Sequence, residues 1–377
     1  MSGFLILLVF PIIWPFIAKK IWGHEITWIE LGINVGVITL LVSGVWFAGK
    51  YGQTVDTEIW NGSIVGKERI HDTYEQSYEC NCSEQCSGSG KDRSCTTVCD
   101  TCYETHYTVD WNAIATYGLG KEKITLDSED STWSSVYDTP DPKIYLDCAA
   151  GQPASKSSRY TNYVQAVPDS LFNMATDTAV YMEQVPAYPR VFNIYRYNRV
   201  IDIGSGIHKL ILEDLNTRLN EALISLGSKK QVNILVIVTG NTDPSFRYAV
   251  ENKWVGGKKN DATIFIGVSN GEIIWTDVMT FALNKGNELY HVMTRDTLKS
   301  VGTFDSEKIA NIIVEKTAKH YDRATMEEFE YLADQIQPAT WVIILAIFIA
   351  IFGSIGISYV MTRVDIGGGR RYNRNRY

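Results

Sequence analysis

Three apolar stretches constrain the fold of this chain more than any other feature. Residues 31–49 and 341–361 are runs of 19 and 21 uncharged residues. At about 1.5 Å per residue, each run makes a helix long enough to cross the roughly 30 Å hydrocarbon core of a bilayer. Residues 3–18 are also uncharged, but they reach only about 24 Å and contain Pro11 and Pro15. For them a short or kinked span and an anchor in the membrane plane both fit. The sequence therefore predicts an integral membrane protein in contact with a lipid bilayer.

The distribution of charge predicts how these segments are oriented. Residues 362–377 carry five arginines and one acidic residue, and Lys19 and Lys20 lie between the first two apolar stretches. Basic residues near membrane spans favour the cytoplasmic side. We therefore expect a cytoplasmic C-terminus and a large periplasmic or extracellular domain. The net charge of −8 argues against nucleic acid as a partner, because nucleic-acid binding needs a dense basic surface.

Small residues recur at helical spacing in two of the apolar stretches. Gly32 and Gly36 form a G-x-x-x-G pattern, and Ser354 and Ser358 repeat the spacing near the C-terminus. Small side chains let membrane helices approach closely. The pattern predicts that the two spans pack together, and it also admits a homo-oligomer formed through Gly32 and Gly36.

A dense group of cysteines follows the second apolar stretch. It lies between two runs with strand-like composition, residues 54–65 and 104–116, and the first run contains the turn signal Asn61-Gly62-Ser63. We expect a long antiparallel ribbon whose tip is cross-linked. The six cysteines fall within 23 residues, and they are Cys80, Cys82, Cys86, Cys95, Cys99 and Cys102.

Two chemistries compete for these thiols. An exterior compartment is oxidising and favours disulfides. A zinc knuckle is the alternative, and its ligands would be Cys99 and Cys102 with either Cys80 and Cys82 or His71 and His106. Six cysteines allow 15 disulfide connectivities, so the pairing stays open. Cys148 is a seventh cysteine that is either left over or paired with another chain.

Composition divides the chain into segments of different character. We expect N-terminal membrane segments at 1–50 and a C-terminal membrane helix at 341–361, followed by the basic tail. The exterior region divides into a β-rich domain at 51–165, a proline- and aromatic-rich strap at 166–200, an α/β layered domain at 201–325 and a helical linker at 326–340. The predicted fold class is membrane-anchored α+β.

The α/β part is predicted from alternating periodicities. Apolar residues at helical spacing indicate an amphipathic helix from 207 to 226 that ends at Gly227. Further helices are expected at 246–254 and from Asp305 through 318, the last continuing through 327–335. Strands are expected at 232–239, 262–268 and 272–278, and the last two are joined by an Asn270-Gly271 turn.

This order of elements resembles a known family. Residues 207–320 resemble the TPM domain, in which a strand and a short helix lead to a tryptophan, a glycine turn, a polar run and a second strand. The matching residues here are Trp254, Gly256, Gly257 and Asp261. The overall layout also resembles uncharacterised membrane proteins of large tailed bacteriophages.

The resemblance carries implications for chemistry. Some TPM proteins are described as acid phosphatases and some bind a divalent cation. The corresponding candidate acidic site here is Asp243, Asp261 and Asp277, with Ca²⁺ as the candidate ion. The sequence departs from the family at Ala262, where glycine is usual, and after the last strand. Both departures weaken the implied activity.

Catalytic motifs are missing from the sequence. It has no G-x-x-x-x-G-K, H-E-x-x-H or G-x-S-x-G pattern, and His208, His291 and His320 have no spaced partner. The function we expect is a non-catalytic exterior interaction or accessory module that acts on a membrane or envelope protein. The alternative is a divalent-cation-dependent, phosphatase-like hydrolase that uses the loop aspartates.

Overall fold

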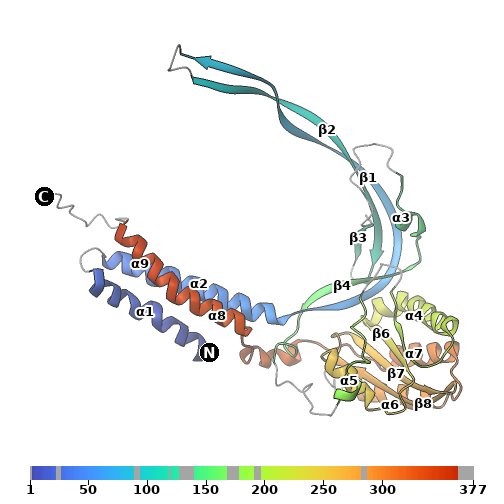
Figure 1. Cartoon of the computed structure of the whole chain (residues 1–377). Helices are drawn as coiled ribbons and strands as arrows, with labels where there is room; N and C mark the ends of the chain where they lie inside the picture. Colours follow the sequence, from blue (N-terminus) through green and yellow to red (C-terminus); the bar gives the residue numbers. More distant parts are fainter. Residues whose placement is uncertain are drawn as a thin grey trace.

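The computed structural model describes residues 2–22, 27–88, 94–118, 120–126, 140–167, 178–190, 197–281 and 287–363. It contains a bundle of apolar helices, a sheet that extends into a long two-stranded ribbon, and an α/β domain beside the base of that sheet (Figure 1). Much of the predicted strap and all of the tail beyond Arg363 lie outside the described residues.

The apolar stretches form helices. They are α1 (Ser2–Trp22), α2 (Trp28–Thr54), α8 (Thr340–Phe348) and α9 (Ser354–Arg363), and one π-helical turn (Ile349–Gly353) joins the last two. Among the described residues, three helical segments are long and apolar enough to cross a membrane. The prediction of membrane spans is confirmed at this level, and the third candidate is the proline-containing α1.

The helices pack side by side in an antiparallel arrangement. A Cβ atom on Gly49 would lie 2.5 Å from Val342 at one end of the bundle, while Asn34 Nδ2 donates to Ser358 Oγ over 2.7 Å at the other. Residues 55–339 therefore leave the bundle at a single end. Helix α1 belongs to the bundle as well, because Trp14 Nε1 donates to Ser358 Oγ over 3.2 Å.

The contact between α2 and α9 uses only part of the predicted pattern. Ser354 and Ser358 are buried in it, as expected. Gly32 and Gly36 are not, since no described atom lies within 4 Å of a Cβ built at either position. Asn34 takes their place, because its amide reaches both Ser354 O and Ser358 Oγ. A homo-oligomer through the two glycines stays a prediction.

The first sheet is wholly antiparallel and has the order β3-β2-β1-β4. Its strands are β1 (Val55–Ser87), β2 (Ser94–Thr116), β3 (Lys121–Thr125) and β4 (Pro153–Thr161), and α3 (Lys143–Asp147) lies beside it. The prediction of a ribbon is confirmed, but its strands are longer than expected.

The predicted turn at Asn61-Gly62-Ser63 is wrong. These residues lie inside β1 and pair with residues 153–155 of β4. Gly62 is needed there for space, because a Cβ atom would lie 1.9 Å from Thr116 O on the neighbouring strand. The glycine therefore marks a close approach of two backbones and not a reversal of the chain.

The second sheet has the order β5-β6-β7-β8, with three parallel strands and an antiparallel edge strand. The strands are β5 (Val200–Ile203), β6 (Asn233–Thr239), β7 (Asp261–Ser269) and β8 (Glu272–Thr280). One face packs on α4 (Lys209–Lys230), α6 (Glu288–Lys299) and α7 (Ser306–His320). The other face packs on α5 (Phe246–Lys253) and on residues 178–190.

Several predicted boundaries shift. Helix α4 does not end at Gly227 but continues to Lys230, and a Cβ at Gly227 would lie 2.5 Å from Asn61 Cβ. This glycine also serves close packing. Helix α7 ends at His320, and the segment Glu327–Asp334 is a separate 3₁₀ helix, η6. Strand β5 and helix α6 were not predicted.

Candidate functional site

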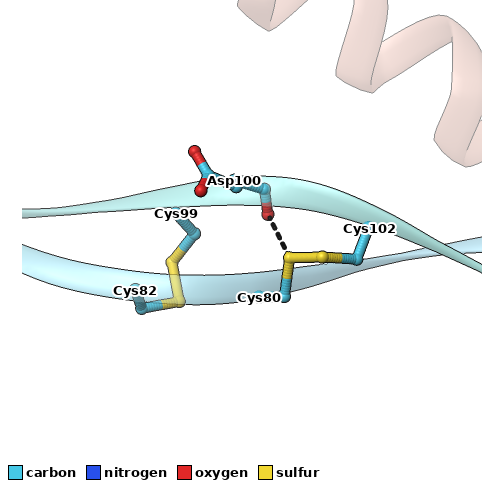
Figure 2. Close-up of a disulfide and its surroundings, with 5 residues drawn as sticks. All are labelled: Cys80, Cys82, Cys99, Asp100 and Cys102. Atoms are coloured by element: carbon cyan, nitrogen blue, oxygen red, sulfur yellow. Dashed lines mark hydrogen bonds between the residues drawn. A yellow bond between two sulfur atoms is a disulfide. The ribbon is translucent and has the colours of Figure 1, made fainter.

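The distal ribbon is the most unusual feature of the described structure. Three disulfides link β1 to β2, and they are Cys80–Cys102, Cys82–Cys99 and Cys86–Cys95. Their Cα atoms are 5.8, 4.0 and 3.9 Å apart, so each bond joins neighbouring positions across the ribbon. Figure 2 shows two of these rungs, with Cys80 Sγ 3.5 Å from Asp100 O. The prediction of disulfides is confirmed.

The zinc alternative does not fit this arrangement. Every cysteine that it would use is bonded to another cysteine. His106 stacks on Tyr74 with ring centroids 5.2 Å apart, which is an ordinary cross-strand contact. Cys148, the seventh cysteine, is free and buried in the core at the base of the sheet, alongside Trp111 and Leu126. It is not placed to bond to another chain.

The ribbon has almost no core of its own. Strand β4 pairs with β1 only as far as Ser63, and β3 pairs with β2 only from Asn112 to Thr116. Beyond those pairs, both faces of the ribbon are largely exposed, including Tyr78 and Tyr103. An isolated hairpin is at best marginally stable in water. The three disulfides therefore stabilise the ribbon in place of a hydrophobic core.

The base of the ribbon is fixed to the α/β domain by a buried arginine. Arg199, immediately before β5, is 1% exposed. Its guanidinium donates to side-chain oxygens on β1, β4, α4 and β6 over 2.5 to 2.8 Å. The acceptors are Asn61, Ser155, Asn220 and Asn233. Burial lowers the pKa of Arg199 to about 10, so the group stays charged at neutral pH.

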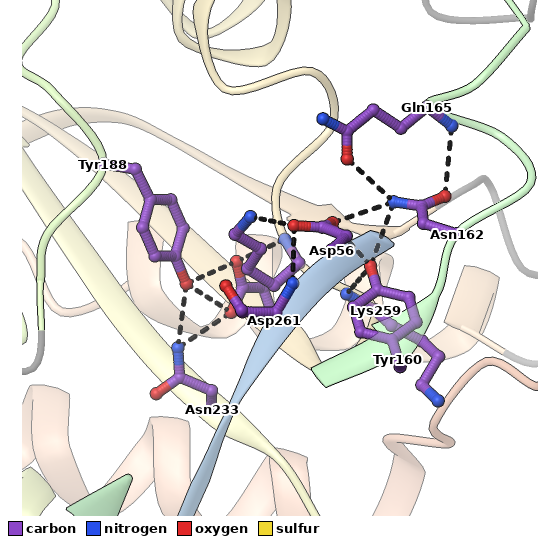
Figure 3. A network of polar contacts seen from close by, with 10 residues as sticks. Asp56, Tyr160, Asn162, Gln165, Tyr188, Asn233, Lys259 and Asp261 are labelled. Carbon is purple, nitrogen blue, oxygen red and sulfur yellow. Dashed lines mark hydrogen bonds and ion pairs between the residues drawn. The ribbon is translucent and has the colours of Figure 1, made fainter. Parts of the chain in front are cut away.

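A buried carboxylate lies next to this arginine. Asn233 accepts from Arg199 and donates through Nδ2 to Asp261 Oδ1 over 2.8 Å. Asp261 also accepts from Tyr188 O–H at 2.9 Å and from the Lys258 backbone N–H at 2.7 Å. Burial raises the pKa of Asp261 to about 6, although all three donors favour the ionised form. Figure 3 shows this group of side chains.

A second polar contact ties the start of β1 to the same domain. Asp56 pairs with Lys258 and accepts from Tyr160 O–H and Asn162 Nδ2, each over 2.9 Å (Figure 3). Glu58, two residues along, is 2% exposed and pairs with Arg323. These buried pairs specify one docking position, because a shift would leave charges unpaired.

The structure places the three candidate aspartates apart. Asp261 begins β7, whereas Asp243 follows the carboxyl end of the parallel strand β6, at the opposite edge of the sheet. Asp243 caps the backbone N–H of Ser245, which holds its pKa below the usual value. Asp277 lies in the middle of β8 and pairs with Arg247 at 3.2 Å. The three side chains do not share one site.

The residues that carry the TPM resemblance have structural roles here. Trp254 Nε1 donates to Pro186 O over 3.0 Å, and its ring packs on Tyr188 at 5.1 Å. Gly256 and Gly257 have φ values of 76° and 80°, in the left-handed region that glycine adopts readily. A Cβ at Gly257 would lie 3.0 Å from Asp261 Oδ2. The turn therefore packs closely against this buried carboxylate.

Two of the three histidines without spaced partners have structural roles, and the third, His320, is the last residue of α7. His208 caps α4, since its Nδ1 accepts from the Leu210 backbone N–H over 3.3 Å. His291 Nε2 lies 2.7 Å from Thr280 Oγ1, and burial lowers the pKa of His291 to about 4. It is therefore neutral at physiological pH and serves the packing of α6 on β8.

Comparison with protein-family models, curated protein sequences and solved structures found no match. The resemblance to the TPM domain therefore rests on the residues quoted above alone. The buried network of Arg199 was not predicted, because its partners come from four separate elements and no local spacing connects them.

Proposed function

We propose that this protein is a membrane-anchored interaction module whose disulfide-linked ribbon is the contact arm for a membrane or envelope protein. One observation carries the proposal. Beyond its base, the ribbon has unpaired edges on both strands and exposed faces on both sides, among the residues described, yet three disulfides hold it in shape.

The physical argument concerns exposed edges. A free strand edge is a template for pairing with another chain, and most proteins keep such edges short, charged or covered. Here the free edges run through residues 64–87 of β1 and 94–111 of β2, in a ribbon that curves away from the α/β domain (Figure 1). The ribbon has no core of its own, and three disulfides stabilise it instead. This cross-linking is explained if the ribbon makes its contacts with another molecule.

The proposed location follows from charge and oxidation. Disulfides persist in oxidising compartments, which supports a periplasmic or extracellular position for residues 55–339. The arginine-rich tail supports a cytoplasmic C-terminus. In this arrangement the TPM-like α/β domain holds the base of the arm through the buried contacts of Arg199 and has an accessory role.

Site-specific photo-cross-linking tests the proposal. A benzoylphenylalanine would replace Tyr103 on the ribbon, which is 67% exposed, in the full chain in its native membrane. The matched control is Tyr331 on η6, which is 66% exposed. We expect a discrete adduct from position 103 and none from position 331. Adducts at neither position, or equally at both, would contradict the ribbon as the contact arm.

A further inference from the structure

One face of the ribbon carries a regular series of acidic and aromatic side chains. Directly opposed residues of an antiparallel pair point to the same side, and side chains repeat every second residue. The pairing of β1 with β2 therefore assigns each ribbon residue to a face. We call one of them the acidic face, and from base to tip it carries Asp110, Asp72, Tyr74, Glu104, Tyr78 and Asp100.

The acidic face lacks compensating charge. All four of its carboxylates are exposed. Within the described part of the ribbon none of them pairs with lysine or arginine, and Glu104 has the imidazole of His106 3.9 Å away. In the sequence between Ile70 and Asp110, the only lysine and arginine are Lys91 and Arg93. Solvated carboxylates in a row repel one another, so a cationic ligand would relieve a repulsion that the chain itself leaves in place.

The spacing of these groups fits an extended ligand. Successive rows on one face are about 6.7 Å apart, which is twice the rise of a strand residue. A strand added to a ribbon edge places its own alternate side chains at the same interval. Lysine or arginine at alternate positions would therefore meet a carboxylate or a tyrosine ring at each row, and tyrosine rings attract cations as well.

We propose that the acidic face binds an extended, cationic segment of the partner polypeptide, in which lysine or arginine recurs at alternate positions. This inference rests on the proposed function of the ribbon as a contact arm and names the chemistry of what it contacts. A second copy of the ribbon would bring like charges together, and an anionic lipid surface would be repelled. Neither fits the charge of this face.

The opposite face supplies a matched control. It carries Glu75 and Glu79, which are equally exposed and lie on the same strand. The double variant Asp72→Asn/Glu104→Gln removes two charges from the acidic face, and Glu75→Gln/Glu79→Gln removes two from the other face. All four positions are solvent-exposed, so neither variant disturbs a core. Thiol titration would verify that the three disulfides form in both.

The test measures peptide binding to the full chain in phosphatidylcholine nanodiscs. The probe is a fluorescent ten-residue peptide of alternating lysine and threonine, followed by anisotropy at low salt. Exposed ion pairs contribute modestly, so we expect about a five- to thirtyfold loss of affinity in Asp72→Asn/Glu104→Gln. Glu75→Gln/Glu79→Gln should change the affinity by less than about twofold.

The outcomes separate this inference from the function on which it rests. An equal loss in both variants would mean unspecific attraction, and no binding of the lysine peptide would mean that the face is not a cation site. Either result overturns the inference. Tyr103 lies opposite Ser77, on the other face, so benzoylphenylalanine at the exposed Tyr78 probes the acidic face itself. If a Tyr78 adduct maps to a partner segment without basic residues, the inference also fails, but the ribbon remains the contact arm.

Discussion

At the scale of single residues, the guanidinium of Arg199 has unusual partners. It is buried, and each of its side-chain partners is a neutral oxygen. The nearest compensating charge in the network is Asp261, which it reaches through the amide of Asn233. One cation thereby orders the side chains of four elements, and its loss would leave several buried acceptors without donors.

We expect Arg199→Met to lower the free energy of unfolding by about 3–5 kcal/mol, because breaking a buried charged network leaves its partners unpaired. Urea denaturation of the full chain in detergent would measure this loss. The control is Arg218→Met, which removes an exposed ion pair with Asp214 and should leave the free energy of unfolding nearly unchanged. Equal losses would show that Arg199 is not a structural centre.

The pH dependence of stability should reveal Asp261. Its pKa is about 6 in the folded chain against 3.8 for the free side chain, so the folded state holds the proton more tightly. The stabilisation from protonation is complete below about pH 4 and is lost as pH rises through 6, by at most about 3 kcal/mol. Asp261→Asn should flatten this part of the pH profile in thermal unfolding, whereas the exposed Asp243→Asn should not. An unchanged slope in Asp261→Asn would contradict the assignment.

For single residues, the sequence predicted which side chains are notable better than it predicted which side chains they contact. Asp261 was singled out, but as a loop acid, and its burial against Tyr188 and Asn233 was not foreseen. Arg199 had no local signature, because its partners are separated from it by 17 to 138 positions. Such contacts form only when two folded units pack together, and the local periodicity of the sequence does not predict that packing.

At the scale of elements, two glycines of β1 make a matched pair. A Cβ at Gly62 would lie 1.9 Å from Thr116 O, while at Gly66 the nearest described atom would be 3.9 Å away. Gly62→Ala should therefore destabilise the protein by about 1–3 kcal/mol or more through backbone displacement. Gly66→Ala should be neutral or slightly stabilising. Melting temperatures would decide, and equal effects would argue against the close approach of β1 and β2.

The disulfides should control the ribbon without controlling the α/β domain. Replacing all six ribbon cysteines by serine removes constraints worth about 2–4 kcal/mol each in typical cases. We expect amide hydrogen exchange to accelerate between residues 72 and 110 and to stay slow in β6 and β7, which are buried in the core of the α/β domain. Cys148→Ala is the control and should leave exchange at the tip unchanged. Faster exchange in β6 would contradict independent ordering of the two parts.

The elements of the α/β domain were largely predictable, since buried strands and amphipathic helices carry strong periodicity. The disulfide pairing was left open, although the expected ribbon held the information. If residues 54–65 and 104–116 belong to the two strands of one hairpin, the cysteines between them can bond to neighbours across the strands only in a nested order. The first cysteine then pairs with the last, and so on inward. The turn at Asn61-Gly62 failed because β4, about 90 residues later, completes a strand there. A tertiary contact overrode local turn chemistry.

At the scale of the whole molecule, the orientation in the membrane can be tested directly. A cysteine at exposed Lys209 should react with a membrane-impermeant maleimide in intact cells, because we expect α4 on the exterior side. A cysteine at Tyr377 should react only after permeabilisation. Cys148 is buried and serves as the internal background. Labelling of position 377 in intact cells would reverse the proposed orientation.

Helix α2 ends at Thr54 and strand β1 begins at Val55, so no linker separates the membrane span from the arm. The backbone N–H of Asn162 donates to Thr54 O over 2.6 Å and braces this junction from the side. The 33 residues of β1 have a contour of about 110 Å at 3.3 Å per residue. The membrane span α2 and the ribbon are therefore continuous, and they are joined at the membrane surface. A small change in the tilt of α2 becomes a much larger sweep of the tip, and a pull on the tip becomes torque on the helix.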